Sequence, residues 1–111
     1  HCSHGKEDPE RAILPAMIAG VAAAAEQETV LFLTVEGVWI ATPGYADSIV
    51  KDGFPSLKEI LAAFIANGGS IWVCGACARP RNIEESNLIP GAIMVTAPKV
   101  VEYIAQGAAT L

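Results

Sequence analysis

Three short apolar runs, separated by segments with helical patterning, constrain the fold of this chain most strongly. The predicted strands are residues 29–35, 70–74 and 92–95. The predicted helices are residues 9–25, 57–67 and 99–108. Strands that alternate with helices along a chain favour right-handed crossover connections and a parallel sheet. The pattern therefore predicts an α/β fold with helices packed on a parallel sheet.

Local signals mark the beginnings of the predicted helices. Asp8 can cap the first helix, and Pro9 suits its first position. Ser56 and Glu59 form a capping box at the start of the second helix. The apolar residues expected on the inner faces of the first and last helices are Ile13, Met17, Ile18 and Val21, and Val100, Val101, Ile104 and Ala105.

The segments between the helices also carry signals. Residues 29–35 are almost wholly apolar, which is typical of an interior parallel strand covered on both faces. Pro80 blocks helix continuation, so residues 75–82 are predicted to form a loop. Residues 84–88 are predicted to form a helical turn. A doubly wound fold normally opens with a strand, and residues 1–5 stand where that strand should end. We expect the opening strand to be truncated to a stub here or to lie upstream.

Composition narrows the class of protein. The 111 residues suit one domain, residues 1–111. A net charge of −5 argues against nucleic-acid binding, which needs a basic surface. No apolar run reaches the ~20 residues of a membrane span, so no membrane partner is expected. The hydrophobic fraction of 52% with 17% charged residues indicates elements buried on two sides or a large subunit interface. We therefore expect a homo-oligomer.

Three cysteines make a poor disulfide framework, and two of them form Cys74-Gly75-Ala76-Cys77. This count indicates thiol or redox chemistry, and a reducing cytoplasm is the expected location. Ligands of open parallel sheets bind beyond the carboxyl ends of the strands. We therefore expect one edge of the sheet to gather the polar residues that follow the strands. These are Cys2, His4, Glu36, Cys74, Cys77, Arg79 and Arg81.

Cys74 ends a predicted strand and is the candidate nucleophile. Gly75 would let the backbone turn sharply, so that N–H groups of the following loop point at the sulfur. Arg79 and Arg81 add two positive charges that favour the thiolate. A thiolate accepts a sulfane sulfur and passes it on. The alternative interpretation is an inert cysteine packed at a strand end.

Other residues near Cys74 have open roles. Cys77 could resolve a disulfide, carry the sulfur itself or line the loop. His4 could donate a proton or be a solvated loop residue, and Glu36 could orient a ligand or be an exposed carboxylate. Zinc could be held by a mixed set of His1, Cys2, His4, Cys74 and Cys77, but a single C-x-x-C is a weak metal signal. We therefore predict no metal and no cofactor.

Several segments together resemble the DsrE/DsrF-like family, over nearly the whole chain. They are Gly-Lys-Glu-Asp-Pro-Glu-Arg-Ala at residues 5–12, the strand through Phe32, Glu36-Gly37-Val38, the helix 57–67, residues 68–77 leading to Arg79, and Leu88-Ile89-Pro90-Gly91-Ala92. The resemblance implies a flavodoxin-like parallel sheet sandwiched by helices, in subunits that assemble into trimers or hexamers. It also implies that Cys74 matches the family cysteine and Arg79 the family arginine.

The resulting hypothesis is a sulfur carrier, or sulfurtransferase-like protein, that holds sulfane sulfur as a persulfide on Cys74. Its expected partners are sulfur donor and acceptor proteins, and Arg79, Arg81 and Gly75 would support the thiolate. A thiol–disulfide module that uses Cys74 and Cys77 is one alternative. A non-catalytic oligomeric binding protein is another.

Overall fold

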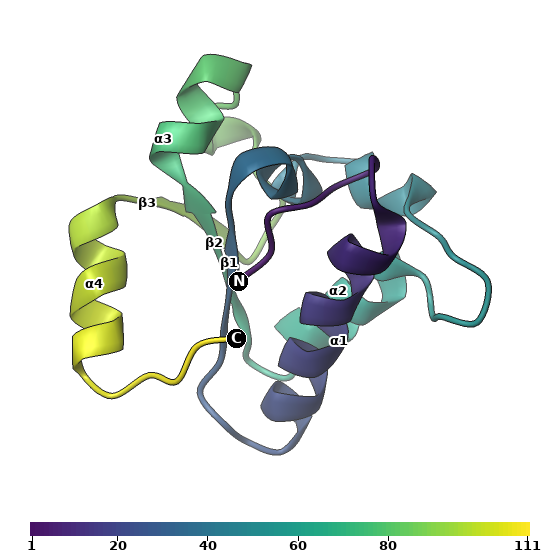
Figure 1. Ribbon diagram of the computed structural model, residues 1–111, viewed down its shortest axis with the longest axis horizontal. Coiled ribbons are helices and arrows are strands. Elements are labelled where there is room, and N and C mark those ends of the chain that lie inside the picture. The colour runs from purple at the N-terminus through teal and green to yellow at the C-terminus, as the bar shows by residue number, and fades with distance from the viewer.

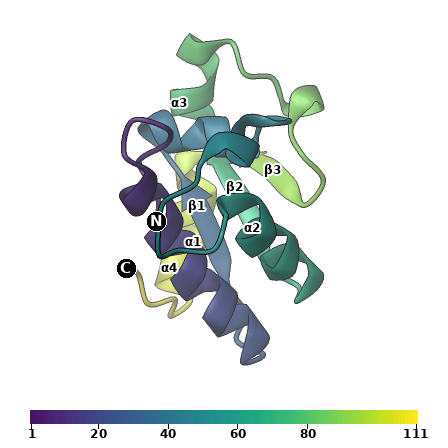
Figure 2. The same ribbon diagram turned by 90° about the vertical axis from the view of Figure 1, so that its right-hand side faces the viewer.

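The computed structural model describes residues 1–111 as an open α/β structure (Figure 1). Its three parallel strands, in the order β1-β2-β3, are β1 (Val30–Leu33), β2 (Ser70–Cys74) and β3 (Ala92–Val95). Its α-helices are α1 (Pro9–Ala24), α2 (Leu57–Ala66), α3 (Gly75–Ala78) and α4 (Ala97–Ala105). Helices α1 and α2 lie on one side of the sheet and α4 on the other (Figures 1 and 2). The flavodoxin-like arrangement of a parallel sheet between helices is therefore present.

The predicted caps explain where the two long helices begin. The Asp8 side chain accepts a hydrogen bond from the backbone N–H of Arg11 at 3.2 Å. The Ser56 hydroxyl accepts one from the backbone N–H of Glu59 at 3.3 Å. Each bond satisfies an N–H group that has no partner inside its helix. The longest helix, α1, has 16 residues, and no helix is long and apolar enough to cross a membrane.

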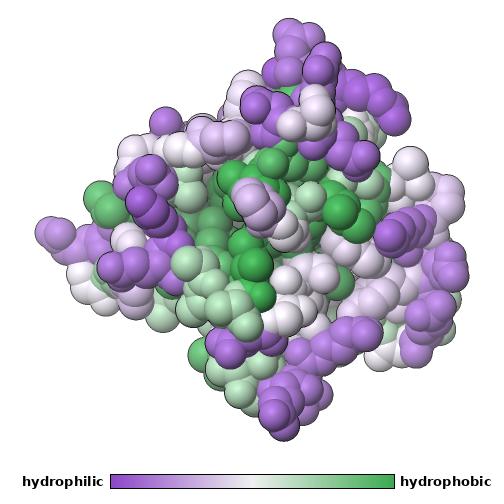
Figure 3. Space-filling view, turned by 180° about the vertical axis from the view of Figure 1, so that it is seen from behind, coloured by the Kyte–Doolittle hydropathy of each residue, from purple (hydrophilic) through white to green (hydrophobic).

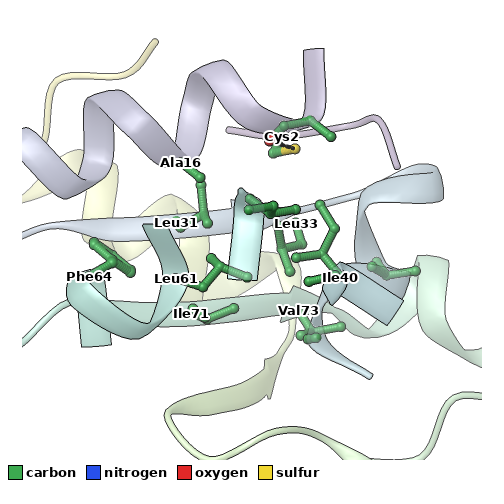
Figure 4. Packing of buried hydrophobic residues seen from close by; sticks show 14 of the residues in the cluster. Cys2, Ala16, Leu31, Leu33, Ile40, Leu61, Phe64, Ile71 and Val73 are labelled. Atoms are coloured by element: carbon green, nitrogen blue, oxygen red, sulfur yellow. Dashed lines mark hydrogen bonds between the residues drawn. The ribbon is translucent and has the colours of Figure 1, made fainter. Parts of the chain in front are cut away.

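The main core lies between the sheet and the pair α1 and α2. Leu31 and Leu33 of β1 and Ile71 and Val73 of β2 face these helices, and Figure 4 shows them against Ala16, Leu61 and Phe64. All of these residues are buried. The strand register sets this face, since Leu31 pairs with Ile71 and Leu33 with Val73. The period-2 alternation of the strands therefore decides which side chains enter the core.

The buried face of α1 differs from the predicted one. Its buried residues are Ala12, Ile13, Ala16, Ala19 and Ala23. Ile18 and Val21 are 50% and 72% exposed, so placing them inward was wrong, whereas Ile13 is buried and Met17 packs partly against the core. Small alanine side chains let α1 lie close to the sheet and to α2. A close fit with alanines has displaced the larger residues to the outside.

The second face of the sheet is only partly covered. Half-buried Val30 and Phe32 alternate with buried residues along β1, so its second face is covered only in part, and the predicted full coverage of both faces was wrong within this chain. No residue of α4 is buried, and Val101 and Ile104 are 64% and 45% exposed, which corrects their predicted inward position. Figure 3 shows apolar residues gathered in the middle of one face of the molecule, with hydrophilic residues around them.

Contacts with one tryptophan hold α4 against the sheet. The Tyr103 ring meets Trp72 edge-on at 5.0 Å between centroids, and the Lys99 ammonium lies 5.0 Å from the Trp72 ring centroid. The Tyr103 hydroxyl also donates a hydrogen bond to Glu28 at 3.1 Å. These contacts fix the helix by aromatic and polar interactions at its inner edge, and its outer apolar side chains stay exposed.

One residue near the start of the sequence pairs with the outer edge of β1. Cys2 forms a parallel bridge with Leu33 of β1. Its backbone N–H donates to the Phe32 carbonyl at 2.8 Å, and its carbonyl accepts from the Thr34 N–H at 2.9 Å. Residues 1–5 therefore contribute one bridging residue beside β1, at the position expected for the end of the opening strand.

The segment after β2 is helical, contrary to the predicted loop at residues 75–82. Helix α3 is one turn, and a 3₁₀ turn (Arg79–Arg81) continues it. Pro80 is tolerated because it lies in the first positions of that 3₁₀ turn, where its missing N–H removes no helical hydrogen bond. Asn82, at φ 57°, then ends the segment in the left-handed region. The helical turn predicted at residues 84–88 is present as a 3₁₀ turn at Glu85–Asn87.

Two glycine-to-alanine substitutions test the packing of this core. A β-carbon on Gly69 would overlap the ring of the buried Phe64, whereas one on Gly20 in α1 would meet only Ile60 Cγ2 at 4.0 Å. We expect Gly69→Ala to lower the free energy of unfolding by about 1–3 kcal/mol through overpacking. We expect Gly20→Ala to raise it by about 0.5–1 kcal/mol through helix propensity. Urea denaturation measures both, and equal effects would contradict the described packing.

Candidate functional site

The carboxyl ends of β1 and β2 lie side by side and lead into the segments that carry the candidate residues. The last aligned pair of these strands is Leu33 with Val73. Strand β1 continues into a 3₁₀ turn (Val35–Ala41), and β2 ends at Cys74 and continues into α3. Figures 1 and 2 show α3 beyond the end of β2 and beside that turn. This edge of the sheet is the candidate site.

An ion pair joins the two segments across this edge. Arg81 donates to Glu36 Oε1 from Nε at 3.2 Å and from Nη2 at 2.9 Å. Its third donor, Nη1, lies 3.0 Å from the backbone carbonyl oxygen of Cys77. The Arg81 side chain is 24% exposed and that of Glu36 is 44% exposed. Arg81 therefore ties α3 to the segment after β1 by three hydrogen bonds.

Cys77 is half-buried beneath this bridge. Burial raises the pKa of the Cys77 thiol above its ordinary value, and the neighbouring Cys74 thiol raises it further. The backbone N–H of Val35 and the Arg81 guanidinium oppose this shift of the pKa. Cys77 therefore favours the protonated thiol at neutral pH, in contact range of the Cys74 sulfur.

Val35 has a backbone conformation that the sequence did not predict. Its φ of 51° lies in the left-handed region, which a β-branched side chain rarely adopts. The residue is 48% exposed, so burial of its side chain does not explain this conformation. Its backbone N–H instead interacts with the Cys77 sulfur. Nothing in the apolar run at residues 29–35 signals such a turn, because valine is typical of strands.

Cys74 is half-buried at the end of β2 and directly precedes Gly75. The predicted capping of its sulfur by the N–H groups that follow is absent, since Cys74 forms no side-chain hydrogen bond at the start of α3. Gly75 has no left-handed φ. A β-carbon on it would lie 3.3 Å from the Val95 carbonyl oxygen and 3.6 Å from Arg79 Nη2. Gly75 is therefore required for close packing and not for a sharp turn.

The two arginines have different surroundings. Arg81 is bound to Glu36, so its charge is largely offset. Arg79 is exposed and forms no salt bridge, and its Nη2 lies 3.6 Å from the position that a β-carbon on Gly75 would occupy. Arg79 is thus a cation near the residue that follows Cys74, and no carboxylate is paired with it.

His4 and Cys2 form hydrogen bonds of their own with other residues. The His4 imidazole is hydrogen-bonded to the Ser3 hydroxyl at 3.0 Å. Cys2 is 2% exposed, and its thiol donates to the carbonyls of His4 at 3.4 Å and Ala12 at 3.8 Å. Burial raises the pKa of the Cys2 thiol. Figure 4 shows Cys2 in the core beside α1, so it is a packing residue.

A group of metal ligands or a surface hollow at the cysteines would mark another kind of site there. No three His, Cys, Asp or Glu side chains are grouped so that they could hold a metal ion together. One hollow is lined by Pro9, residues 50–54 and Ser56, and a second lies mainly against α2 with Ile89 and Pro90. Neither is lined by Cys74 or Cys77. Both hollows therefore lie away from the sheet edge that carries these cysteines.

The chain is an open α/β protein with two thiols at the carboxyl end of its central strand. The sequence matches the DsrE/DsrF-like family over residues 2–111, and the chain belongs to that family.

Curated relatives are archaeal. The chain is 29% identical to the uncharacterized protein MJ0760 of Methanocaldococcus jannaschii, over 92% of this chain and 37% of that protein. It is 30% identical to MJ0989 of the same organism, over 91% of this chain and 82% of that protein. It is 27% identical to MK0008 of Methanopyrus kandleri, over 86% of this chain and 75% of that protein. The chain thus spans little more than a third of the length of MJ0760.

Alkylation of the native protein tests the different environments of the three cysteines. The reagent attacks the thiolate, so the raised pKa of Cys77 should slow its labelling at neutral pH and move its half-maximal rate to higher pH than for an ordinary thiol. Cys2 should react only after unfolding, because it is buried. Mass spectrometry of pH-jump samples measures the order. Labelling of Cys2 in native protein at the rate of Cys77 would contradict the described core.

Proposed function

We propose that this protein relays sulfane sulfur as a persulfide on Cys74. The observation that carries the proposal is the pair of half-buried thiols, Cys74 and Cys77, at the end of β2 in a DsrE/DsrF-like chain. The family points to a sulfur-relay role, and the geometry offers a thiol that reagents can reach. A sulfurtransferase-like activity follows from this role.

Loading is a transfer between sulfur atoms. The Cys74 thiolate attacks the outer sulfur of a donor persulfide, R–S–SH. A bond forms between the Cys74 sulfur and the outer sulfur, and the S–S bond of the donor breaks. The donor leaves as the thiolate R–S⁻, and Cys74 carries –S–SH. An acceptor thiolate removes the outer sulfur by the same step. No external oxidant is needed, because the sulfane sulfur keeps its oxidation state.

Cys77 offers a second outcome for the loaded protein. Its thiol can attack the inner sulfur of the Cys74 persulfide. A Cys74–Cys77 disulfide forms, the outer sulfur leaves as HS⁻ with the Cys77 proton, and it is thereby reduced while the two cysteines are oxidised. A thiol reductant then restores both cysteines. This step would discharge the carrier without an acceptor.

Arg79 is the residue that we assign to support charge at Cys74. Its guanidinium lies beside Gly75 and has no carboxylate partner, so it can stabilise the anionic Cys74 thiolate and persulfide. Gly75 leaves room for this approach. Arg81 acts on Cys77 instead, through its bonds to Glu36 and to the Cys77 carbonyl. His4 has no part in the proposed step.

We also propose that the relay works between a donor protein and an acceptor protein in a reducing cytoplasm, where free thiols persist. The chain would do so as a homotrimer or homohexamer. Support comes from the apolar side chains left exposed where α4 meets the sheet, namely Ile93, Val101 and Ile104. Burial of such side chains between subunits would stabilise an assembly.

Intact-protein mass spectrometry tests the carrier. Wild type, Cys74→Ala and Cys77→Ala are each incubated with glutathione persulfide and then treated with a thiol reductant. We expect wild type and Cys77→Ala to gain one or more sulfur atoms that the reductant removes. We expect Cys74→Ala to gain none. A gain that persists in Cys74→Ala and vanishes in Cys77→Ala would transfer the carrier role to Cys77.

The same experiment separates the second candidate function, a thiol–disulfide module of Cys74 and Cys77. The observation that favours it is the interaction of the Cys74 thiol with the Cys77 thiol, which raises the pKa of Cys77. No sulfur gain in any protein, with a reversible Cys74–Cys77 disulfide of measurable potential, would establish this module instead. Neither a sulfur gain nor a disulfide, with both thiols open to alkylation, would leave a non-catalytic binding protein.

Light scattering after size-exclusion chromatography tests the assembly. We expect a mass three or six times the 11.6 kDa of the chain. Val101→Asp should dissociate it, because a charge would enter the proposed interface on α4. The matched control is Val50→Asp, which changes a similarly exposed valine, 60% against 64%, in a distant loop. A monomer in wild type would overturn the proposal, and dissociation by Val50→Asp alone would move the interface away from α4.

A further inference from the structure

The bridge from Arg81 acts on Cys77 more directly than on Cys74. Two of its donors hold Glu36 Oε1, at 2.9 and 3.2 Å, and the third holds the carbonyl of Cys77 itself. Glu36 follows β1, whereas Cys77 lies on α3 after β2. The planar guanidinium thus fixes the position of the Cys77 backbone relative to the end of β1. There the backbone N–H of Val35 interacts with the Cys77 sulfur.

The charges around Cys77 come from few groups. Cys74 faces it from the end of β2, Arg81 from the following 3₁₀ turn, and Glu36 lies behind Arg81 on the turn after β1. Arg81 is the only one of these that favours a thiolate at Cys77. Because Glu36 is bound to Arg81, the positive field at the Cys77 sulfur is reduced. Arg81 therefore orients the backbone of Cys77, while Glu36 offsets part of the charge with which Arg81 favours its ionisation.

We infer that Glu36, by binding Arg81, restrains the one cation beside Cys77 that would activate its thiol, and so protects a persulfide on Cys74 from premature discharge by Cys77. Attack of Cys77 on the inner sulfur of the persulfide requires the Cys77 thiolate. While the pair is intact, this thiolate is scarce and the sulfur stays on Cys74 for an acceptor. Discharge would increase when Glu36 loses its charge or its hold on Arg81.

Protection of a persulfide on Cys74 rests on the proposed relay, whereas the effect of Glu36 on the reactivity of Cys77 does not. The first experiment therefore uses Cys74→Ser protein, in which Cys77 is the remaining reachable thiol because Cys2 is buried. The rate of alkylation by iodoacetamide is measured as a function of pH. Glu36→Gln is compared with the parent, and Asp47→Asn, which removes the carboxylate of the Asp47–Lys58 pair at 3.9 Å, is the matched control.

We expect Glu36→Gln to increase the alkylation rate of Cys77 at neutral pH about two- to fivefold, with the half-maximal rate at lower pH. Arg81→Gln should move the half-maximal rate to higher pH. Asp47→Asn should leave it unchanged. A merely loosened α3 would raise the rate at all pH values without moving the midpoint. An unmoved midpoint in Glu36→Gln, with circular dichroism showing a folded protein, would overturn the inference.

A second experiment measures protection directly. Proteins with Cys74 intact are loaded with glutathione persulfide, freed of donor, and followed for release of sulfide. Glu36→Gln should release sulfide faster than wild type, and Glu36→Gln with Cys77→Ala should not. Equal release from wild type and Glu36→Gln would contradict protection. If no protein takes up sulfur but the alkylation midpoint still moves in Glu36→Gln, the relay fails while the control of Cys77 by the ion pair stands.

Discussion

Parallel pairing of β1 with β2 is the constraint on which the rest of the candidate site depends. Because Leu33 lies opposite Val73, both strands end together at one edge of the sheet. Glu36 and Arg81, 45 residues apart in sequence, can then meet at 2.9 Å. The backbone N–H of Val35, just after β1, likewise reaches the Cys77 sulfur. A shift of one residue in this pairing would turn the strand side chains to the opposite face of the sheet and separate Glu36 from Arg81.

The sequence predicted those features of the fold that depend on local patterns. Strands β2 and β3 match residue for residue, and the caps at Asp8 and Ser56 begin the helices as expected. Features decided by tertiary contact were missed. The inner face of α1 consists mainly of alanines because α1 lies close to the sheet. The pattern of apolar residues alone does not show how closely a helix approaches its neighbours. Exposure of Val101 was missed because amphipathicity does not show what covers a helix.

The candidate site was predictable in its composition and not in its connections. Strand ends in an α/β fold identify Glu36, Cys74 and Cys77 as neighbours, since topology alone brings them to one edge. The topology does not show which charged side chains will bind one another. Arg81 was expected to serve Cys74, yet three hydrogen bonds direct it to Glu36 and Cys77. The left-handed conformation of Val35 had no signal in the sequence, because the residue ends an apolar run. Cys2 and His4 were expected at the same sheet edge, but their side chains form hydrogen bonds with other residues.

Localisation of the sulfur within wild-type protein tests transfer to Cys74 most directly. No lysine or arginine lies between Cys74 and Cys77, so trypsin leaves both on one peptide and fragment ions must separate them. The measurement is tandem mass spectrometry of protein loaded with glutathione persulfide, trapped by alkylation and digested. Sulfur transfer to Cys74 predicts the added sulfur on fragments that contain Cys74, with Cys77 carrying only the alkyl group. Added sulfur on Cys77 alone, with Cys74 only alkylated, would contradict it.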